Sequence, residues 1–336
     1  MKAYKIPHTD LVVSRIAYGC GMLANWDQEP LGAETIAKAV RLINTAYDNG
    51  ITLFDHADLY CFGKAEAVFG EVLKRSPGLR EKIIIQSKCG QKFPDGWKIG
   101  DGIHVDLGRE YIIRAAEGSL KRLGSDSLDI LLLHVPDALV ELEEIAQAFD
   151  ALKRSGKVRY FGVSNYTAAQ IAGLQKYLSH KLVANQVQLG LAHPHLIADG
   201  MEFTLELIRG ALKKHAYAGY SGTGTLDYCR LHDIQIQAWS PLRGDLLNPS
   251  LDAAPEVKQT AQMLADLAKE KNTTASAIGL AWLLNHGAGI VPIIGTTNPK
   301  HLIENCMADR VTLSRDEWYA LFASAARIDA RKIAST

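Results

Sequence analysis

The sequence predicts a (β/α)8 (TIM) barrel, and two observations lead to that fold class. Short β-rich runs alternate with segments of helical periodicity along most of the chain. These runs are continuously apolar, as expected for parallel strands that helices cover, and lack the alternation of half-exposed strands. About eight such units in roughly 300 residues favour a closed barrel over an open doubly wound sheet.

The barrel strands are predicted from the apolar runs in chain order. They are residues 15–21, 51–55, 82–87, 128–134, 158–164, 183–188, 234–240 and 290–295. Before them, residues 3–6 and 11–13 flank the polar turn 7–10 and predict a β-hairpin that caps the bottom of the barrel.

Helices are predicted between these strands, at residues 34–48, 111–123, 139–154 and 255–271. Asn272 and Thr273 are expected to cap a further helix that runs to Asn285. Two long βα loops, 89–108 and 199–224, follow strand ends, where barrel active sites lie, and the second contains a short amphipathic pattern. No linker or shift in composition divides the chain, so residues 1–336 are predicted to form one domain.

Composition argues against several classes of function. Lys plus Arg and Asp plus Glu both number 37, so no net field favours nucleic acid or an anionic membrane. The five cysteines are scattered without a C-x-x-C pair, which is typical of free thiols in a reducing compartment. A polar N-terminus and the lack of a long apolar run predict a cytoplasmic protein without a membrane span. The oligomeric state is left open.

Polar residues that could carry chemistry stand at or just past three predicted strand ends. They are Asp55, Tyr60, Lys88 and His134. The carboxyl ends of barrel strands meet at one face, so these side chains can converge. A lysine ammonium stabilises a neighbouring phenolate, so Lys88 is expected to lower the pKa of Tyr60, while Asp55 keeps Lys88 charged. With His134 to polarise a carbonyl oxygen, the set suits proton donation during carbonyl reduction.

The same residues also have a purely structural interpretation. Asp55 and Lys88 can form an ion pair at the barrel rim. Tyr60 can pack under a loop, and His134 can be a hydrogen-bonded core histidine. Their spacing alone leaves both interpretations open.

Seven segments, in order along the chain, resemble the aldo-keto reductases. They are FDHADLY at 54–60, QSKCG at 86–90, LLLH at 131–134, GVSNY at 162–166, NQVQ at 185–188, AWSPL at 238–242 and PIIGT at 292–296. The similarity extends over residues 5–325 and looks closest to the bacterial-type branch, in which His follows the catalytic Asp.

The resemblance implies a reductase of aldehydes and ketones that uses a nicotinamide cofactor, with Asp55, Tyr60, Lys88 and His134 as its catalytic tetrad. The residues that it implies for cofactor binding are Gly21, Ser164, Asn165, Gln186, Trp239, Ser240, Pro241, Leu242, Arg243, Gly244, Gly295, Thr296, Thr297, Asn298, Lys300 and Asn305. Trp239 would stack on the nicotinamide ring. The residues expected to line a pocket for an apolar or aromatic carbonyl compound are Trp26, Cys61, Phe62, Trp97 and Val135.

The chain departs from the family pattern where the 2′-phosphate of NADPH is usually held. Members that prefer NADPH place Lys and Arg around the last strand–helix junction, and Gly295 and His301 stand at those positions here. Lys300 or Arg243 can supply the missing charge, so NADPH is favoured and NADH is the alternative.

Two other functions compete with the reductase. A metal-dependent barrel hydrolase would need ligands from His56, Asp58, His134, His193 and His195. Such hydrolases usually carry H-x-H on the first strand, whereas 193–195 follows the sixth, so no metal is predicted. A non-catalytic nucleotide-sensing or channel-regulatory subunit is the other alternative, because fold alone does not fix function.

Overall fold

The computed structural model describes residues 1–27, 29–94, 101–199, 201, 223–326 and 328. Eight strands close into a barrel in the order β10-β11-β12-β3-β4-β5-β8-β9, and each pairs in parallel with its neighbours. Their bounds are β3 Ala17–Gly19, β4 Leu53–Asp55, β5 Ile84–Cys89, β8 Leu128–Leu133, β9 Val158–Ser164, β10 Leu182–Gln188, β11 Gln235–Trp239 and β12 Val291–Ile294. The predicted (β/α)8 barrel is therefore confirmed.

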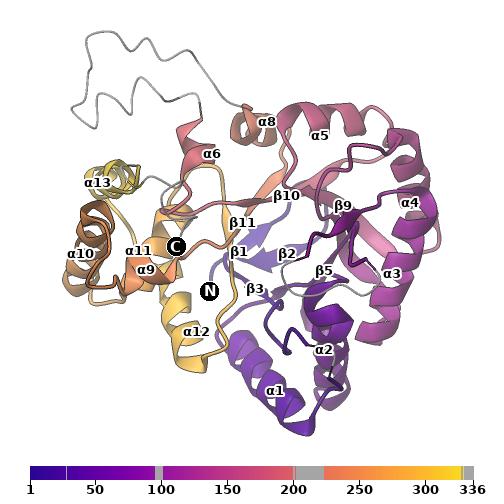
Figure 1. The fold of residues 1–336 in the computed structure, drawn as a ribbon, viewed down its shortest axis with the longest axis horizontal. Helices are drawn as coiled ribbons and strands as arrows, with labels where there is room; N and C mark the ends of the chain where they lie inside the picture. Colours follow the sequence, from indigo (N-terminus) through magenta and orange to yellow (C-terminus); the bar gives the residue numbers. More distant parts are fainter. Residues whose placement is uncertain (28, 95–100, 200, 202–222, 327, 329–336) are drawn as a thin grey trace.

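Helices surround the barrel and cover the outer face of the sheet (Figure 1). They are α1 Ala33–Asp48, α2 Lys64–Arg75, α3 Arg109–Leu123, α4 Leu142–Arg154, α5 Ala168–Gln175, α6 His195–Ala198, α8 Thr225–Leu231, α9 Gly244–Leu247, α10 Pro255–Glu270, α11 Ala275–Leu284, α12 Pro299–Cys306 and α13 Arg315–Ala325. Short 3-10 turns lie at Tyr60–Gly63, Arg80–Lys82 and Met307–Arg310. Because helices bury the outer face, the strands are apolar on both faces over most of their length.

A β-hairpin closes the amino end of the barrel, as the sequence predicts. Strands β1 (Ala3–Lys5) and β2 (Val12–Ser14) pair antiparallel. Ile6, Leu11 and Val13 from this hairpin are buried in one apolar cluster with barrel residues such as Leu53 and Ile130. This cluster fills the bottom of the barrel and leaves the opposite, carboxyl end for the site.

Most predicted helix ends agree with the structure, and two differ. Gly124 ends α3 in the left-handed conformation, with φ of 62°. Helix α4 begins at Leu142, three residues later than predicted. The predicted caps of α11 are wrong: Asn272 has a φ of 49°, and the cap is Thr274, whose hydroxyl accepts the Ala277 N–H at 3.2 Å. Only Thr274 combines an extended backbone with a side chain that reaches the first turn.

The first of the two predicted long loops follows β5 at the carboxyl end of the barrel. In the first, β6 (Gln91–Lys92) pairs antiparallel with β7 (His104–Val105). Trp97 and the amphipathic pattern within 199–224 lie outside the described residues. Of the helices that the structure describes, none is long and apolar enough to cross a membrane.

Candidate active site

A cavity of about 900 Å³ opens at the carboxyl end of the barrel. Its wall combines residues from the ends of the strands with residues from the N-termini of α11 and α12. Asp55, Tyr60 and His134 all line it, so side chains from two separate βα units meet at one place.

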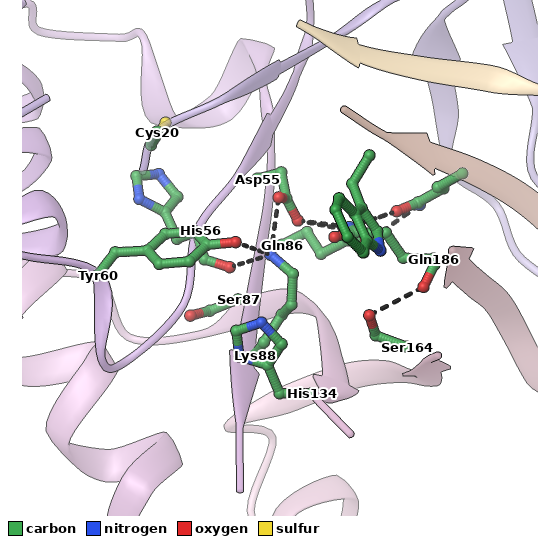
Figure 2. Close-up of polar contacts among 12 residues, drawn as sticks. Cys20, Asp55, His56, Tyr60, Gln86, Ser87, Lys88, His134, Ser164 and Gln186 are labelled. Carbon is green, nitrogen blue, oxygen red and sulfur yellow. Dashed lines mark hydrogen bonds and ion pairs between the residues drawn. The ribbon is translucent and has the colours of Figure 1, made fainter. Parts of the chain in front are cut away.

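Lys88 lies beneath this cavity and connects two of the predicted catalytic residues. Its ammonium donates to Asp55 Oδ2 at 2.7 Å, to the His56 carbonyl at 2.7 Å and to the Tyr60 hydroxyl at 3.1 Å (Figure 2). The lysine side chain is fully buried. Its three N–H groups therefore each have an acceptor, and one of these is the hydroxyl that lines the cavity.

Burial and charge act in opposite directions on these groups. Burial alone would lower the pKa of Lys88, but the Asp55 carboxylate and the Tyr60 oxygen raise it above its usual value. The ammonium therefore stays charged, as expected from the sequence. For Tyr60, burial raises the pKa and outweighs the opposite effect of Lys88, so the net shift is upward. Lys88 thus acts on Tyr60 in the expected direction, but burial disfavours the phenolate more than the nearby charge stabilises it.

His134 stands beside Tyr60, with the two rings edge to face and 5.9 Å between their centroids. Burial, together with the Lys88 charge, holds the pKa of His134 well below its usual value, so the ring is neutral near pH 7. Its Nδ1 is buried and has no partner among the described residues. That leaves Nε2 as the ring nitrogen available for a ligand in the cavity, where a neutral imidazole can donate one hydrogen bond.

The turn that carries Tyr60 has a strained backbone. Cys61, Phe62 and Gly63 follow it in the left-handed region, with φ of 51°, 59° and 82°. The Cys61 thiol anchors the turn by donating to the Ala24 carbonyl at 3.0 Å. Such strain persists only where surrounding contacts hold it, and here they direct the hydroxyl of Tyr60 toward Lys88.

Four of the residues predicted to bind the nicotinamide form a connected wall. Ser164 donates to the Gln186 carbonyl at 2.9 Å. Asn165 donates to the His134 carbonyl and to the Ser164 hydroxyl, both at 3.1 Å, and accepts from Trp239 Nε1 at 3.0 Å. The amide group of Asn165 thus connects the ends of three strands, β8, β9 and β11.

The other predicted cofactor residues divide into two groups. Those that line the cavity are Gly21, Ser240, Pro241, Leu242, Gly295, Thr296 and Asn305. Those that lie outside its lining are Arg243, Gly244, Thr297, Asn298 and Lys300. Arg243 pairs with Asp245, with Nε 2.9 Å from Oδ1, and Asn298 caps α12 by accepting the Lys300 N–H at 2.9 Å.

Several lining residues were not predicted as cofactor contacts. Thr274, Ala275 and Ser276 line the cavity from the start of α11, and His301 and Glu304 line it from α12. Thr274 and Ser276, two polar residues at the start of a helix, could have indicated a contact with the cavity. They were not predicted because they are far in sequence from the end of the last strand.

The predicted substrate pocket is only partly formed by the expected side chains. Trp26 and Val135 line the cavity, together with Met22 and Gln91. Cys61 is buried outside the lining, and Phe62 packs on Trp26 with 6.2 Å between ring centroids. Trp97 lies outside the described residues. Among the described residues, no three His, Cys, Asp or Glu side chains lie close enough together to hold a metal ion.

A closed barrel with a buried lysine linking a carboxylate to a tyrosine at the cavity floor defines a class of barrel oxidoreductases. The comparisons place the chain within it. A model of the aldo/keto reductase family matches residues 15–202 and 218–325, and the chain belongs to this family.

Relatives and solved structures agree with this assignment. The 6-dehydroglucose reductase of Agrobacterium fabrum is 36% identical over 94% of this chain and 95% of its own. Oxidoreductase YdhF of Escherichia coli is 33% identical, with the same coverage. The thermostable aldo-keto reductase Tm1743, solved with the inhibitor epalrestat, has a TM-score of 0.73 and 25% identity over 96% of this chain and 100% of its own. The protein is an oxidoreductase of this family.

Proposed function

We propose that this protein reduces aldehydes and ketones with a nicotinamide cofactor, and that Tyr60 is the proton donor. The observation that carries the proposal is the chain of contacts from Asp55 through buried Lys88 to the Tyr60 hydroxyl at the cavity wall. A structural ion pair at a barrel rim would not need to place its lysine against a hydroxyl that opens into a cavity.

The cavity fits a nicotinamide dinucleotide in its chemistry. Trp239 offers an aromatic face near the tetrad, and the N-terminus of α11 supplies a positive dipole end that favours phosphate. A Cβ at position 21 would lie 3.5 Å from the Tyr60 ring. Because Gly21 has no side chain, that ring stays accessible. Gln186, Ser164 and Trp239 would hold the nicotinamide half, and Ser240, Thr296 and Asn305 the remainder.

The residues of this chain would then act on the carbonyl oxygen. A bound reduced nicotinamide supplies a hydride to the carbonyl carbon. Tyr60 gives its proton to the oxygen, and the Lys88 ammonium stabilises the phenolate that remains. His134, neutral in the buried site, donates a hydrogen bond to the same oxygen from Nε2. Asp55 keeps Lys88 charged throughout, and the same groups serve alcohol oxidation in reverse.

We also propose NADPH over NADH as the cofactor. His301 lines the cavity from α12, and the neighbouring Lys300, with its side chain 81% exposed and its Nζ 3.9 Å from the Glu304 carboxylate, adds positive charge to the same helix. The helix N-terminus adds a further attraction for an anion. The test is calorimetric titration with both cofactors: His301→Ala should weaken NADPH by about 3- to 10-fold and leave NADH unchanged. Equal effects on both cofactors would argue against a 2′-phosphate contact.

For the substrate, we propose a small apolar or aromatic carbonyl compound. Trp26, Met22 and Val135 give this part of the cavity an apolar surface, and Gln91 adds one polar group. Because the Agrobacterium relative is named for 6-dehydroglucose, a sugar aldehyde belongs in the substrate panel beside aromatic and aliphatic aldehydes.

The deciding experiment follows NADPH oxidation by absorbance across that panel, for wild type and Tyr60→Phe. Tyr60→Phe should lose about 10²- to 10⁴-fold in turnover while the protein stays folded and its cofactor affinity stays unchanged. Tyr177→Phe, at an exposed tyrosine outside the cavity lining, is the control. Binding without turnover in wild type would favour the nucleotide-sensing alternative, and loss of binding altogether would overturn the proposal.

A further inference from the structure

Three buried glutamines connect the predicted catalytic carboxylate with the cavity wall inside the barrel. Gln86 and Gln186 both donate through Nε2 to Asp55 Oδ1, at 2.6 Å and 2.9 Å. Both also donate to Gln237 Oε1, at 2.8 Å and 3.1 Å. Gln237 returns a bond from its Nε2 to Gln86 Oε1 at 2.9 Å. Figure 2 shows Gln86 and Gln186 on the side of Asp55 away from Tyr60.

The direction of every amide in this network follows from one group. An ionised carboxylate only accepts hydrogen bonds, so Gln86 and Gln186 must turn their NH₂ groups toward Asp55. Their second N–H bonds then require an acceptor, which fixes the carbonyl of Gln237 toward them. The NH₂ group of Gln237 consequently points to Gln86 Oε1. A reversed amide at any of these positions would place two donors or two acceptors against each other.

This polarity determines what Gln186 offers to a ligand. Both hydrogens of its Nε2 are used, and no described residue donates to its Oε1. Gln186 lines the cavity, so its side chain can present only an acceptor there. An acceptor recognises the NH₂ of a carboxamide and gives nothing to a methyl ketone of the same shape.

We infer that Gln86 and Gln237 are positioning residues: together with Asp55 they orient Gln186 so that the site selects a cofactor bearing a carboxamide NH₂. The inference rests on the proposed nicotinamide cofactor. It assigns to two strand-interior glutamines, neither of which lines the cavity, a part in ligand recognition through Gln186.

The barrel also supplies a matched control. Gln235 is as buried as the other glutamines, and its Oε1 accepts from Gln237 Nε2 at 2.9 Å. Its own Nε2 is buried with no partner among the described residues, and it makes no bond to Asp55 or Gln186. Gln235→Met removes the same chemical group from the same interior and one bond to Gln237, but Gln186 keeps both of its own bonds and Gln237 keeps its bond to Gln86.

The experiment compares dissociation constants by calorimetry for NADP⁺ and for its 3-acetylpyridine analogue, in which a methyl replaces the NH₂. Wild type and Gln235→Met should bind NADP⁺ about 3- to 10-fold more tightly than the analogue. In Gln237→Met, Gln186 loses one of its two partners, and this preference should fall to about 2-fold or less. The 2′-phosphorylated adenosine diphosphoribose fragment, which lacks the nicotinamide, should bind all variants equally.

The outcomes separate the inference from the proposed function. If the preference survives in a folded Gln237→Met, or is lost equally in Gln235→Met, the inference is wrong. If Gln237→Met does not fold, Gln86→Met takes its place, because it removes the partner that sets the direction of Gln237. If wild type binds neither NADP⁺ nor the fragment, the proposed function itself fails.

Discussion

The two ends of the barrel are built from the same strands but depend on different forces. At the amino end, Leu53 and Ile130 pack against the hairpin side chains in a wholly apolar cluster. Two residues further along β4 stands Asp55. It pairs with Gln86 on β5, and Lys88 lies two residues beyond Gln86. The side chains inside the barrel thus change from apolar to polar within two residues along the strand. One end is held by area removed from water, and the other by polar atoms that partner one another.

The difference has consequences for how each end tolerates change. Truncating an apolar side chain costs transfer and cavity energy at that site. Removing one member of a buried polar set leaves its partner unsatisfied, which costs more than the bond contributed. We therefore expect substitutions at the carboxyl end to lower activity and stability together, and those at the amino end to lower stability alone.

The largest effect is expected for Lys88→Met. This change removes the charge beside Tyr60 and leaves the buried Asp55 carboxylate without its ion-pair partner. Turnover should fall by about 10³-fold or more, and the free energy of unfolding by about 3–5 kcal/mol. Urea unfolding and NADPH oxidation measure the two effects. Lys74→Met, at an exposed pair on α2, should change neither; a Lys88→Met protein with a tenth of wild-type turnover would remove this lysine from the mechanism.

Ile6→Ala tests the amino end. The Ile6 side chain is fully buried in the hairpin cluster, so its truncation should cost about 2–4 kcal/mol in the free energy of unfolding. Turnover per folded molecule should stay within about 2-fold of wild type, because Ile6 does not line the cavity and, of the cluster members, only Ile293 does. Val12→Ala, on the same hairpin and 53% exposed, is the control and should be near neutral. A large loss of turnover in Ile6→Ala would show that the two ends are coupled.

Asp58 is an exception at the carboxyl end, because its Oδ1 is buried without a partner among the described residues. Burial raises the pKa of Asp58 to about 7, with Glu66 adding to the rise and Arg122 opposing it. A folded-state pKa above the unfolded value stabilises the protein at low pH. That stability is lost as pH rises from about 4 through about 7.

Asp58→Asn should therefore become more stable relative to wild type as pH rises. Between about pH 4.5 and 8 the difference in free energy of unfolding should grow by roughly 2 kcal/mol. Urea unfolding at a series of pH values measures it, and Asp266→Asn, exposed on α10, should show no such trend. A pH-independent difference would mean that Asp58 is ionised in the folded protein throughout this range.

Sequence predicted much of this contrast, and its failures have physical causes. The apolar runs predicted the strands. Because barrel strands end at one face, the placement of Asp55 and Lys88 at strand ends also predicted that these two side chains lie together. Gln86 and Gln237 were overlooked as isolated polar residues within apolar strands. Each directly follows an isoleucine in a buried strand, where a glutamine needs a buried partner, and that was the available signal.

Other features could not be obtained from sequence. The upward shift in the pKa of Tyr60 depends on how completely neighbouring segments exclude water from it. Whether Arg243 is free to bind a phosphate depends on the conformation that brings Asp245 within 2.9 Å of it. Both are properties of packing between segments, and residue order carries no direct record of them.

The smallest effect is expected for Asp10→Ala, at the hairpin turn of the amino end. Asp10 accepts from Arg159 at 2.8 Å and from the Tyr160 hydroxyl at 2.7 Å, but its side chain is 68% exposed. Water and salt screen such a pair, so its loss should cost only about 0.5 kcal/mol in the free energy of unfolding. The cost should shrink further between about 0.05 M and 1 M salt.

Asp129 provides the matched comparison, because it pairs with the same Arg159 at 2.7 Å and its side chain is only 3% exposed. It also accepts the Ile85 N–H at 2.9 Å. Asp129→Ala should cost several times more than Asp10→Ala and should respond little to salt, since a buried carboxylate leaves its donors unsatisfied when it is removed. Equal costs for the two aspartates would show that the hairpin depends on its charges, and the contrast between an apolar and a polar end of the barrel would then be wrong.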